Sequence, residues 1–203
     1  MKYSFIFILY LLLSCKQEKA ISQQFTSVLP KNIDTIRFKK YQREFNANLR
    51  LVDISTGVDS FEIRFKYNYS LFVEKDLFVI TYTKGSWKGF HYAYQNKKNS
   101  DSLIFVQREF TPSISWEILI GSIYKHPILN ISSQVDLVNY KNRVADGQYF
   151  TLEYATKNKF KTISYENPEY YPEFKESKIV LDFIKMFYRN MHPDEICWPR
   201  VCK

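Results

Sequence analysis

The chain has 203 residues and a formal net charge of +8, with 29 lysines and arginines against 21 aspartates and glutamates. The basic residues are scattered in small clusters and the sequence contains no nucleic-acid-binding motif, so we expect no nucleic-acid partner. Aromatic residues make up 18% of the chain and only 5 residues are glycine. This composition favours β-strands and leaves little room for glycine-rich loops that cradle phosphate groups.

The start of the chain has the layout of an export signal. One lysine precedes a run of uncharged, mostly apolar residues, which is followed by a serine and by Cys15. This run is too short for a transmembrane helix, which needs about 20 residues. The tetrapeptide Leu-Leu-Ser-Cys over residues 12–15 resembles the lipobox of bacterial lipoproteins, although its second position more often holds a smaller residue. The resemblance implies that residues 1–14 are removed as a signal peptide. It also implies that Cys15 is acylated, for example with palmitate, and anchors an exported protein to a membrane of the cell envelope.

Residues 15–24 are then the lipidated cysteine and a flexible tether, because the residues after the cysteine are polar and lack apolar periodicity. We predict a single domain over residues 25–203, which is long enough to bury a sizeable core. Residues 33–49 carry a strand-like alternation and also apolar residues at helical spacing. Helix and strand therefore both remain open for this segment.

Five successive segments rich in β-branched and aromatic residues are predicted strands. They span residues 49–54, 60–69, 77–83, 87–94 and 102–110. Their short connections predict an antiparallel meander. Within the second segment, apolar side chains fall on one face, whereas Glu62, Arg64 and Lys66 fall on the other. This alternation predicts a sheet with one face open to water.

A helix is predicted after these strands, with Ser113 or Ser115 as its N-cap. It should end at His126, because proline follows and disfavours helical geometry in the residue before it. An Asp-Gly turn then starts a hairpin whose strands span residues 148–154 and 160–165.

The clearest helical pattern lies near the C-terminus, over residues 173–190. Its apolar residues share one face of a helix, and they are Val180, Phe183, Ile184, Phe187 and Met191. We therefore predict an α+β fold, in which an antiparallel meander sheet has one face covered by two helices.

Two further cysteines, Cys197 and Cys202, follow this helix. In an oxidising compartment we predict a disulfide bond between them, which would pin the C-terminal tail. The spacing of His192 from the same cysteines would also suit three zinc ligands. The disulfide is the stronger interpretation, and we predict no metal site.

Catalytic signatures are missing: the sequence contains no G-x-S-x-G, no H-E-x-x-H and no phosphate-binding loop. We therefore predict no enzymatic activity, no catalytic residues and no cofactor. A hydrolase stays an alternative, in which His91 acts with carboxylates near the hairpin. Those carboxylates are Asp146, Glu153, Glu166 and Glu169.

The anchor and the missing catalytic signatures favour a non-catalytic, protein-binding domain of an envelope lipoprotein, acting as an assembly factor or an inhibitor. An alternative is that an aromatic face of the domain binds a glycan or a small apolar molecule. The candidate contact residues for a ligand or a partner are Trp87, Tyr92, Tyr94 and Trp198. Trp116 is instead expected in the core, because it lies on the apolar face of the first predicted helix.

Overall fold

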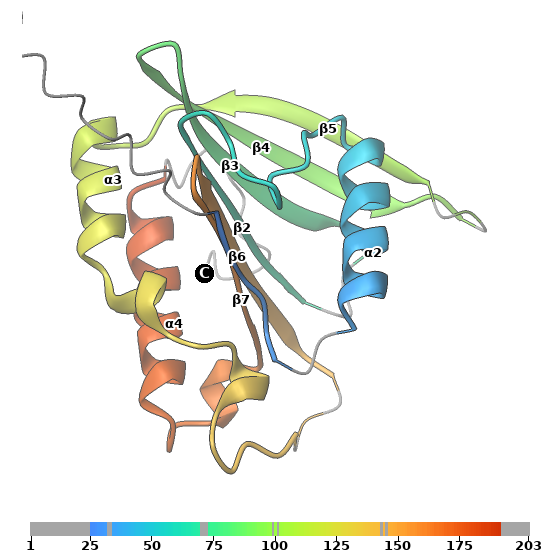
Figure 1. Cartoon of the computed structure of the whole chain (residues 1–203), viewed down its shortest axis with the longest axis vertical. Coiled ribbons are helices and arrows are strands. Elements are labelled where there is room, and N and C mark those ends of the chain that lie inside the picture. The colour runs from blue at the N-terminus through green and yellow to red at the C-terminus, as the bar shows by residue number, and fades with distance from the viewer. Residues whose placement is uncertain are drawn as a thin grey trace, which may run out of the picture.

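The computed structural model describes residues 25–31, 34–69, 73–98, 100, 102–142, 144 and 146–191. Within this part of the chain, three α-helices flank a seven-stranded sheet (Figure 1). The predicted α+β class and the largely antiparallel sheet are confirmed. The predictions for Cys15, its tether, His192, Trp198 and the pair Cys197 and Cys202 lie outside the described residues.

The seven strands belong to one sheet, in the spatial order β1-β7-β6-β2-β3-β4-β5. Their bounds are β1 Thr26–Val28, β2 Phe61–Tyr69, β3 Lys75–Thr83, β4 Ser86–Asn96, β5 Leu103–Phe110, β6 Gln148–Thr156 and β7 Lys159–Glu166. β1 runs parallel to β7, and the other neighbouring strands of this sheet are antiparallel. The C-terminal hairpin of β6 and β7 lies beside β2, so the middle of the sheet pairs an early strand with a late one.

Helices α3 (Trp116–Lys125) and α4 (Lys175–Arg189) contribute side chains to the main hydrophobic core, together with one face of the sheet (Figure 1). The N-cap of α3 is Ser115, whose hydroxyl accepts a hydrogen bond from the Ile118 amide at 3.3 Å. α3 ends at His126, as predicted. The apolar stripe predicted on α4 is buried, and its members are Val180, Phe183, Ile184, Phe187 and Met191.

The segment that carries both helical and strand-like patterns forms helix α2 (Thr35–Asn48), on the opposite side of the sheet from α4 (Figure 1). Asp34 caps this helix, because its carboxylate accepts hydrogen bonds from two amides of the first turn, both at 3.1 Å. Phe45 of α2 shares a buried cluster with Leu77 of β3, whereas the next residue, Phe78, belongs to the core under α4. Successive residues of a strand point to opposite faces, so helices cover both faces of this sheet.

The prediction of a sheet face open to water is wrong for β2. Glu62, Arg64 and Lys66 are 7%, 1% and 9% exposed. α2 and the loop that follows it cover their face of the sheet, so these charged side chains are buried. The alternation along β2 is as predicted. Its charged face is covered by α2, whose segment carries both helical and strand-like patterns in the sequence.

Residues 49–54 were predicted to form a strand, and they do not. Leu49 ends α2, and Arg50 has a φ of 57°, a left-handed conformation that turns the chain. The Val52 carbonyl then accepts a hydrogen bond from Arg64 Nη2 at 2.7 Å. The segment lies over the sheet instead of joining it, and its apolar content reflects buried residues such as Ile54, which is 2% exposed.

Candidate functional site

The sheet face under α2 carries a layer of buried polar side chains, with Arg64 at its centre. Arg64 Nε donates to a Glu62 carboxylate oxygen at 2.7 Å, and Nη2 lies 2.7 Å from the same oxygen. Nη1 donates to Asn46 Oδ1 of α2 at 2.8 Å, and Nη2 also donates to the Val52 carbonyl. This side chain therefore has a carboxylate partner for its charge and acceptors for its donors. It ties α2 and the following loop to β2.

Glu153 of β6 is paired with Arg64 in the sheet register and is 1% exposed. Its carboxylate accepts a hydrogen bond from the side-chain amide of Gln42 on α2. A buried carboxylate is costly without donors. The contact with Gln42 satisfies one of its oxygens and joins the middle of α2 to the sheet.

Lys66 lies two residues further along the same face of β2, in a different environment. Its ammonium lies 4.0 Å from the centre of the Phe45 ring, at cation–π distance. Among the described residues, no side chain or carbonyl accepts a hydrogen bond from this ammonium, and no carboxylate forms an ion pair with it. Burial lowers the pKa of Lys66. The negative charge of Glu153 opposes this effect and the positive charge of Arg64 adds to it.

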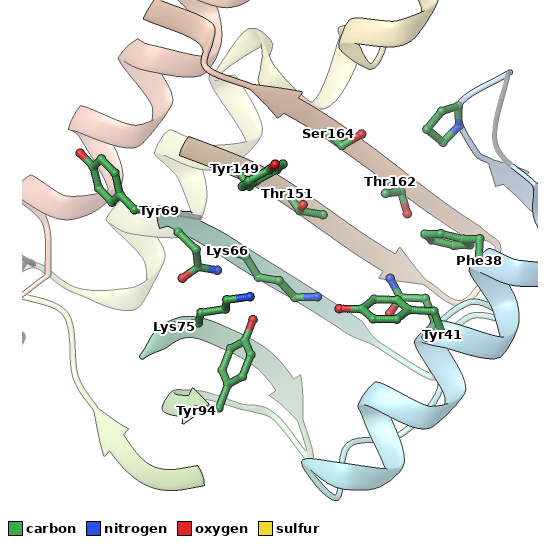
Figure 2. Close-up of a pocket in the computed structure, with 13 residues that line it drawn as sticks. Phe38, Tyr41, Lys66, Tyr69, Lys75, Tyr94, Tyr149, Thr151, Thr162 and Ser164 are labelled. Carbon is green, nitrogen blue, oxygen red and sulfur yellow. The ribbon is translucent and has the colours of Figure 1, made fainter. Parts of the chain in front are cut away.

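A cavity of about 500 Å³ opens beside Lys66, between the N-terminal half of α2 and the sheet (Figure 2). We call it the α2 cavity. Helix α2 contributes Phe38, Tyr41 and Gln42 to its wall. Five strands contribute polar and aromatic side chains, among them Lys66, Lys75, Tyr94, Tyr149, Thr151 and Thr162. The cavity thus combines aromatic walls with a polar floor.

Polar groups with unused bonding capacity face the α2 cavity. Figure 2 shows Lys66 with its amine directed toward α2, and Lys75 of β3 beside it. These two lysines are the charged side chains among the described residues that line the cavity. Thr162 Oγ1 of β7 is buried and lacks a hydrogen-bond partner in the described structure. The cavity is therefore electropositive, and its wall contains a buried hydroxyl that has no hydrogen-bond partner among the described residues.

The aromatic residues predicted as contacts do not share one surface. Tyr94 lines the α2 cavity, and Tyr92 lies in the cluster under α2, where it is 5% exposed. Trp87 lies on the opposite face of the sheet. Its ring centroid is 4.8 Å from that of Tyr82 and 5.7 Å from that of Phe61, so it packs against the main core. Of the described candidates, the structure places Tyr94 alone at the cavity wall.

The acid and base considered for a hydrolase are not brought together. Glu153 lies on the α2 face of the sheet, whereas His91 lies on the α4 face, stacked on Phe78. His91 Nε2 is 2.6 Å from Asp76 Oδ1, so its partner is a different carboxylate. Of the other hairpin carboxylates, Asp146 and Glu169 are exposed and Glu166 is half-buried.

Lys66, Lys75 and α2 were not predicted to form a site. Charged residues that alternate with apolar ones on a strand normally face water, and nothing within β2 marks the positions that a helix will cover. The available signal lay in residues 33–49, where Tyr41, Phe45 and Leu49 recur at helical spacing. An apolar stripe of this kind must pack against another element.

Comparisons with protein-family models, with curated proteins and with solved structures found no match. Within the described part of the chain, no helix has the length and apolar content needed to cross a membrane. The same residues contain no group of three or more histidine, cysteine, aspartate and glutamate side chains placed to hold a metal ion. The function is therefore argued from the geometry of the α2 cavity.

Proposed function

We propose that this protein binds a small molecule in the α2 cavity. The observation that carries the proposal is the cavity itself, whose volume of about 500 Å³ lies within the range of small-molecule sites. Such sites combine apolar and aromatic walls with a few polar groups that fix the orientation of the ligand. Phe38, Tyr41 and Tyr149 supply the aromatic part, and Thr151 supplies polar atoms beside them.

The proposal includes no catalytic step. Two observations support a binding role: His91 and Glu153 are separated by the sheet, and among the described residues the charged side chains that line the cavity are both lysines. A general acid–base pair needs two groups within reach of one substrate. The α2 cavity offers positive charge, hydroxyl groups and ring faces, which are binding groups.

Cavity filling tests the proposal on the full-length protein. Two naphthyl compounds serve as probes, 1-naphthaleneacetate and its uncharged counterpart 2-(1-naphthyl)ethanol. We expect isothermal titration calorimetry to show binding of at least one of them. Thr151→Trp should abolish that binding, because the indole occupies the cavity. The matched control Thr83→Trp, at an exposed position of β3, should leave it unchanged. The proposal is contradicted if neither probe binds to the wild-type protein. It is also contradicted if Thr151→Trp and Thr83→Trp bind a probe equally well.

We also propose that the chain is an envelope lipoprotein anchored to a membrane through Cys15. The lipobox-type tetrapeptide over residues 12–15 supports this location. In cells that express the full chain, Cys15→Ser should move the protein from the membrane fraction to the soluble fraction. Retention of this variant in the membrane pellet would contradict lipidation as the anchor. A disulfide between Cys197 and Cys202 stays a prediction, and titration of free thiols before and after reduction tests it.

A second candidate function is the binding of a partner protein at strand β5. β5 is the last strand in the order of the described sheet, so its outer edge has unpaired backbone groups. Ile104 and Val106 on this strand are 51% and 55% exposed. We propose a partner that adds an extended segment to this edge, the geometry of β-strand addition. Cross-linking in intact cells should recover one partner, and Ile104→Lys combined with Val106→Lys should remove it. Unchanged recovery from this double variant would contradict the candidate.

A further inference from the structure

The charged groups near Lys66 already have partners. Arg64 is bonded to Glu62, Asn46 and the Val52 carbonyl, and Glu153 accepts a hydrogen bond from Gln42. These contacts give the charged groups of the polar layer hydrogen-bond partners that do not include Lys66. The Lys66 residue is 9% exposed. Its ammonium lies against the Phe45 ring and has no hydrogen-bond acceptor among the described residues. Burying an ammonium without an acceptor is costly, and an anion in the cavity would supply that acceptor.

Two further groups extend this anion site. Lys75 of β3 adds a second positive charge at the wall of the α2 cavity, beside Lys66 in Figure 2. Thr162 Oγ1 adds a hydrogen-bond donor that no described residue engages. The unused donors therefore come from three strands, β2, β3 and β7, and they line the same cavity.

The chemistry of the cavity favours a carboxylate over a phosphate. The Glu153 carboxylate is next to Thr162 in the sheet register and opposes a doubly charged group. A carboxylate has one charge shared by two oxygens. One lysine ammonium and one threonine hydroxyl match that pair of acceptors.

Aromatic side chains define the rest of the ligand. Phe38 and Tyr41 come from α2, and Tyr94 and Tyr149 come from the sheet. We infer that the α2 cavity binds a small organic carboxylate with a planar apolar body, its carboxylate on Lys66 and Thr162 and its body between the aromatic walls. Lys75, at the wall of the α2 cavity, adds to the attraction of the anion. This inference rests on the proposed function and names the class of ligand.

Three probes that share a naphthyl body test the charge requirement in the full-length protein: 1-naphthaleneacetate, 2-(1-naphthyl)ethanol and 1-naphthyl phosphate. Each charged hydrogen bond contributes a factor of about ten or more in affinity. The wild-type protein should therefore bind the carboxylate about tenfold or more tightly than the alcohol, and more tightly than the phosphate ester. Isothermal titration calorimetry at one pH and one salt concentration measures all three affinities.

Two variants localise the effect. Lys66→Met should remove most of the preference for the carboxylate over the alcohol, while the affinity for the alcohol stays unchanged and reports an intact fold. Thr162→Val, which keeps the side-chain shape, should lower the affinity for the carboxylate alone. Lys84→Met, at an exposed turn position, is the charge-matched control and should retain the full preference.

The outcomes separate the two proposals. If carboxylate and alcohol bind equally to the wild-type protein, and Thr151→Trp blocks both, the carboxylate inference is overturned and the ligand-binding function stands. Tighter binding of the phosphate ester overturns the assignment of the anion. If none of the probes binds, or Thr151→Trp does not block them, both proposals fail together.

Discussion

Arg64 and Lys66 lie two positions apart on the same face of β2, and their charged groups have different partners. Arg64 is bonded to Glu62, Asn46 and a backbone carbonyl. Lys66 has the Phe45 ring beside it and no described acceptor. In energetic terms the first residue maintains the fold, and the second leaves bonding capacity for a ligand.

Replacing each of these residues by methionine should separate the two roles. Arg64→Met should lower the free energy of unfolding by about 3 kcal/mol or more, because it leaves the Glu62 carboxylate buried without its partner. Lys66→Met should leave it unchanged or raise it by about 1 kcal/mol or more, because the substitution removes a buried ammonium that has no hydrogen-bond acceptor in the described structure. Urea unfolding followed by circular dichroism measures both. Equal losses for the two variants would contradict this division.

Gly89 of β4 illustrates close packing at a single position. A Cβ atom built on it would lie 2.6 Å from the Phe110 ring and 2.7 Å from the Trp116 ring. Trp116 therefore packs over a strand position that has no side chain. It is half-buried and lies against the main core, so its predicted place in the core is met only in part. The indole covers the backbone of the sheet here.

The alanine variant tests this packing. Gly89→Ala should lower the free energy of unfolding by about 1 to 3 kcal/mol, the usual cost of overpacking. Gly121→Ala is the matched control on α3, where an added Cβ meets no atom within 4 Å. It should stabilise the protein by about 0.5 to 1 kcal/mol, because alanine is the better helix former. A neutral result for Gly89→Ala in thermal unfolding would show that the rings move aside.

At the scale of the element, α2 packs against the sheet unevenly along its length. Phe45 and Leu49, at its C-terminal end, are 5% and 1% exposed. Ile36 and Tyr41, in the half that covers the α2 cavity, are 83% and 57% exposed. Packing supplies most of the stability of a short helix. The half over the cavity therefore depends more on its Asp34 cap.

Hydrogen exchange should show this gradient. We expect the amides around Tyr41 to exchange faster than those around Asn46, and Asp34→Ala to widen the difference, since loss of an N-cap costs about 1 kcal/mol. Adding 1-naphthaleneacetate should slow exchange in the half over the cavity. Ser115→Ala, the cap variant of α3, should leave α2 unchanged. Uniform exchange along α2 would contradict uneven anchoring.

At the scale of the whole molecule, buried tyrosines couple the fold to alkaline pH. Burial is the main reason why the pKa values of Tyr94, Tyr165 and Tyr188 are raised above 10.0. Below pH 10 these groups are protonated in the folded and unfolded states. Above pH 10 the unfolded chain loses protons that the folded protein keeps, so stability falls as pH rises.

Each such tyrosine should lower the free energy of unfolding by up to about 1.4 kcal/mol per pH unit above 10. Tyrosinate absorbance should therefore rise steeply with unfolding, in step with the loss of circular dichroism. Above pH 10, Tyr165→Phe should reduce the pH dependence of the free energy of unfolding by the contribution of one tyrosine. A gradual absorbance titration that accounts for all 16 tyrosines near pH 10, with an intact dichroism spectrum, would contradict this coupling.

The fold as a whole shows which features the sequence predicts and which it does not. The N-cap Ser115 and the apolar stripe of α4 were predictable, because a cap or a stripe depends on residues close together along one helix. The burial of Lys66 was not, because it depends on where α2 packs. Residues 49–54 were mistaken for a strand, since β-branched residues suit a covering segment as well as a sheet. A cavity forms where two elements stand apart, and no local pattern encodes that separation.

The pairing of β2 with β6 also bears on when the chain can fold. Phe61 is paired with Thr156, so the middle of the sheet needs residues far apart in the sequence, and such contacts form slowly. During synthesis, β2 to β5 emerge before the C-terminal hairpin, and until then the edge of β2 that pairs with β6 has no partner strand. A sheet that is completed late suits the export proposed above, because a chain crosses an export channel in an extended form. A circular permutant that places β6 and β7 before β2 should complete the sheet earlier, and under that proposal less of it should reach the membrane fraction.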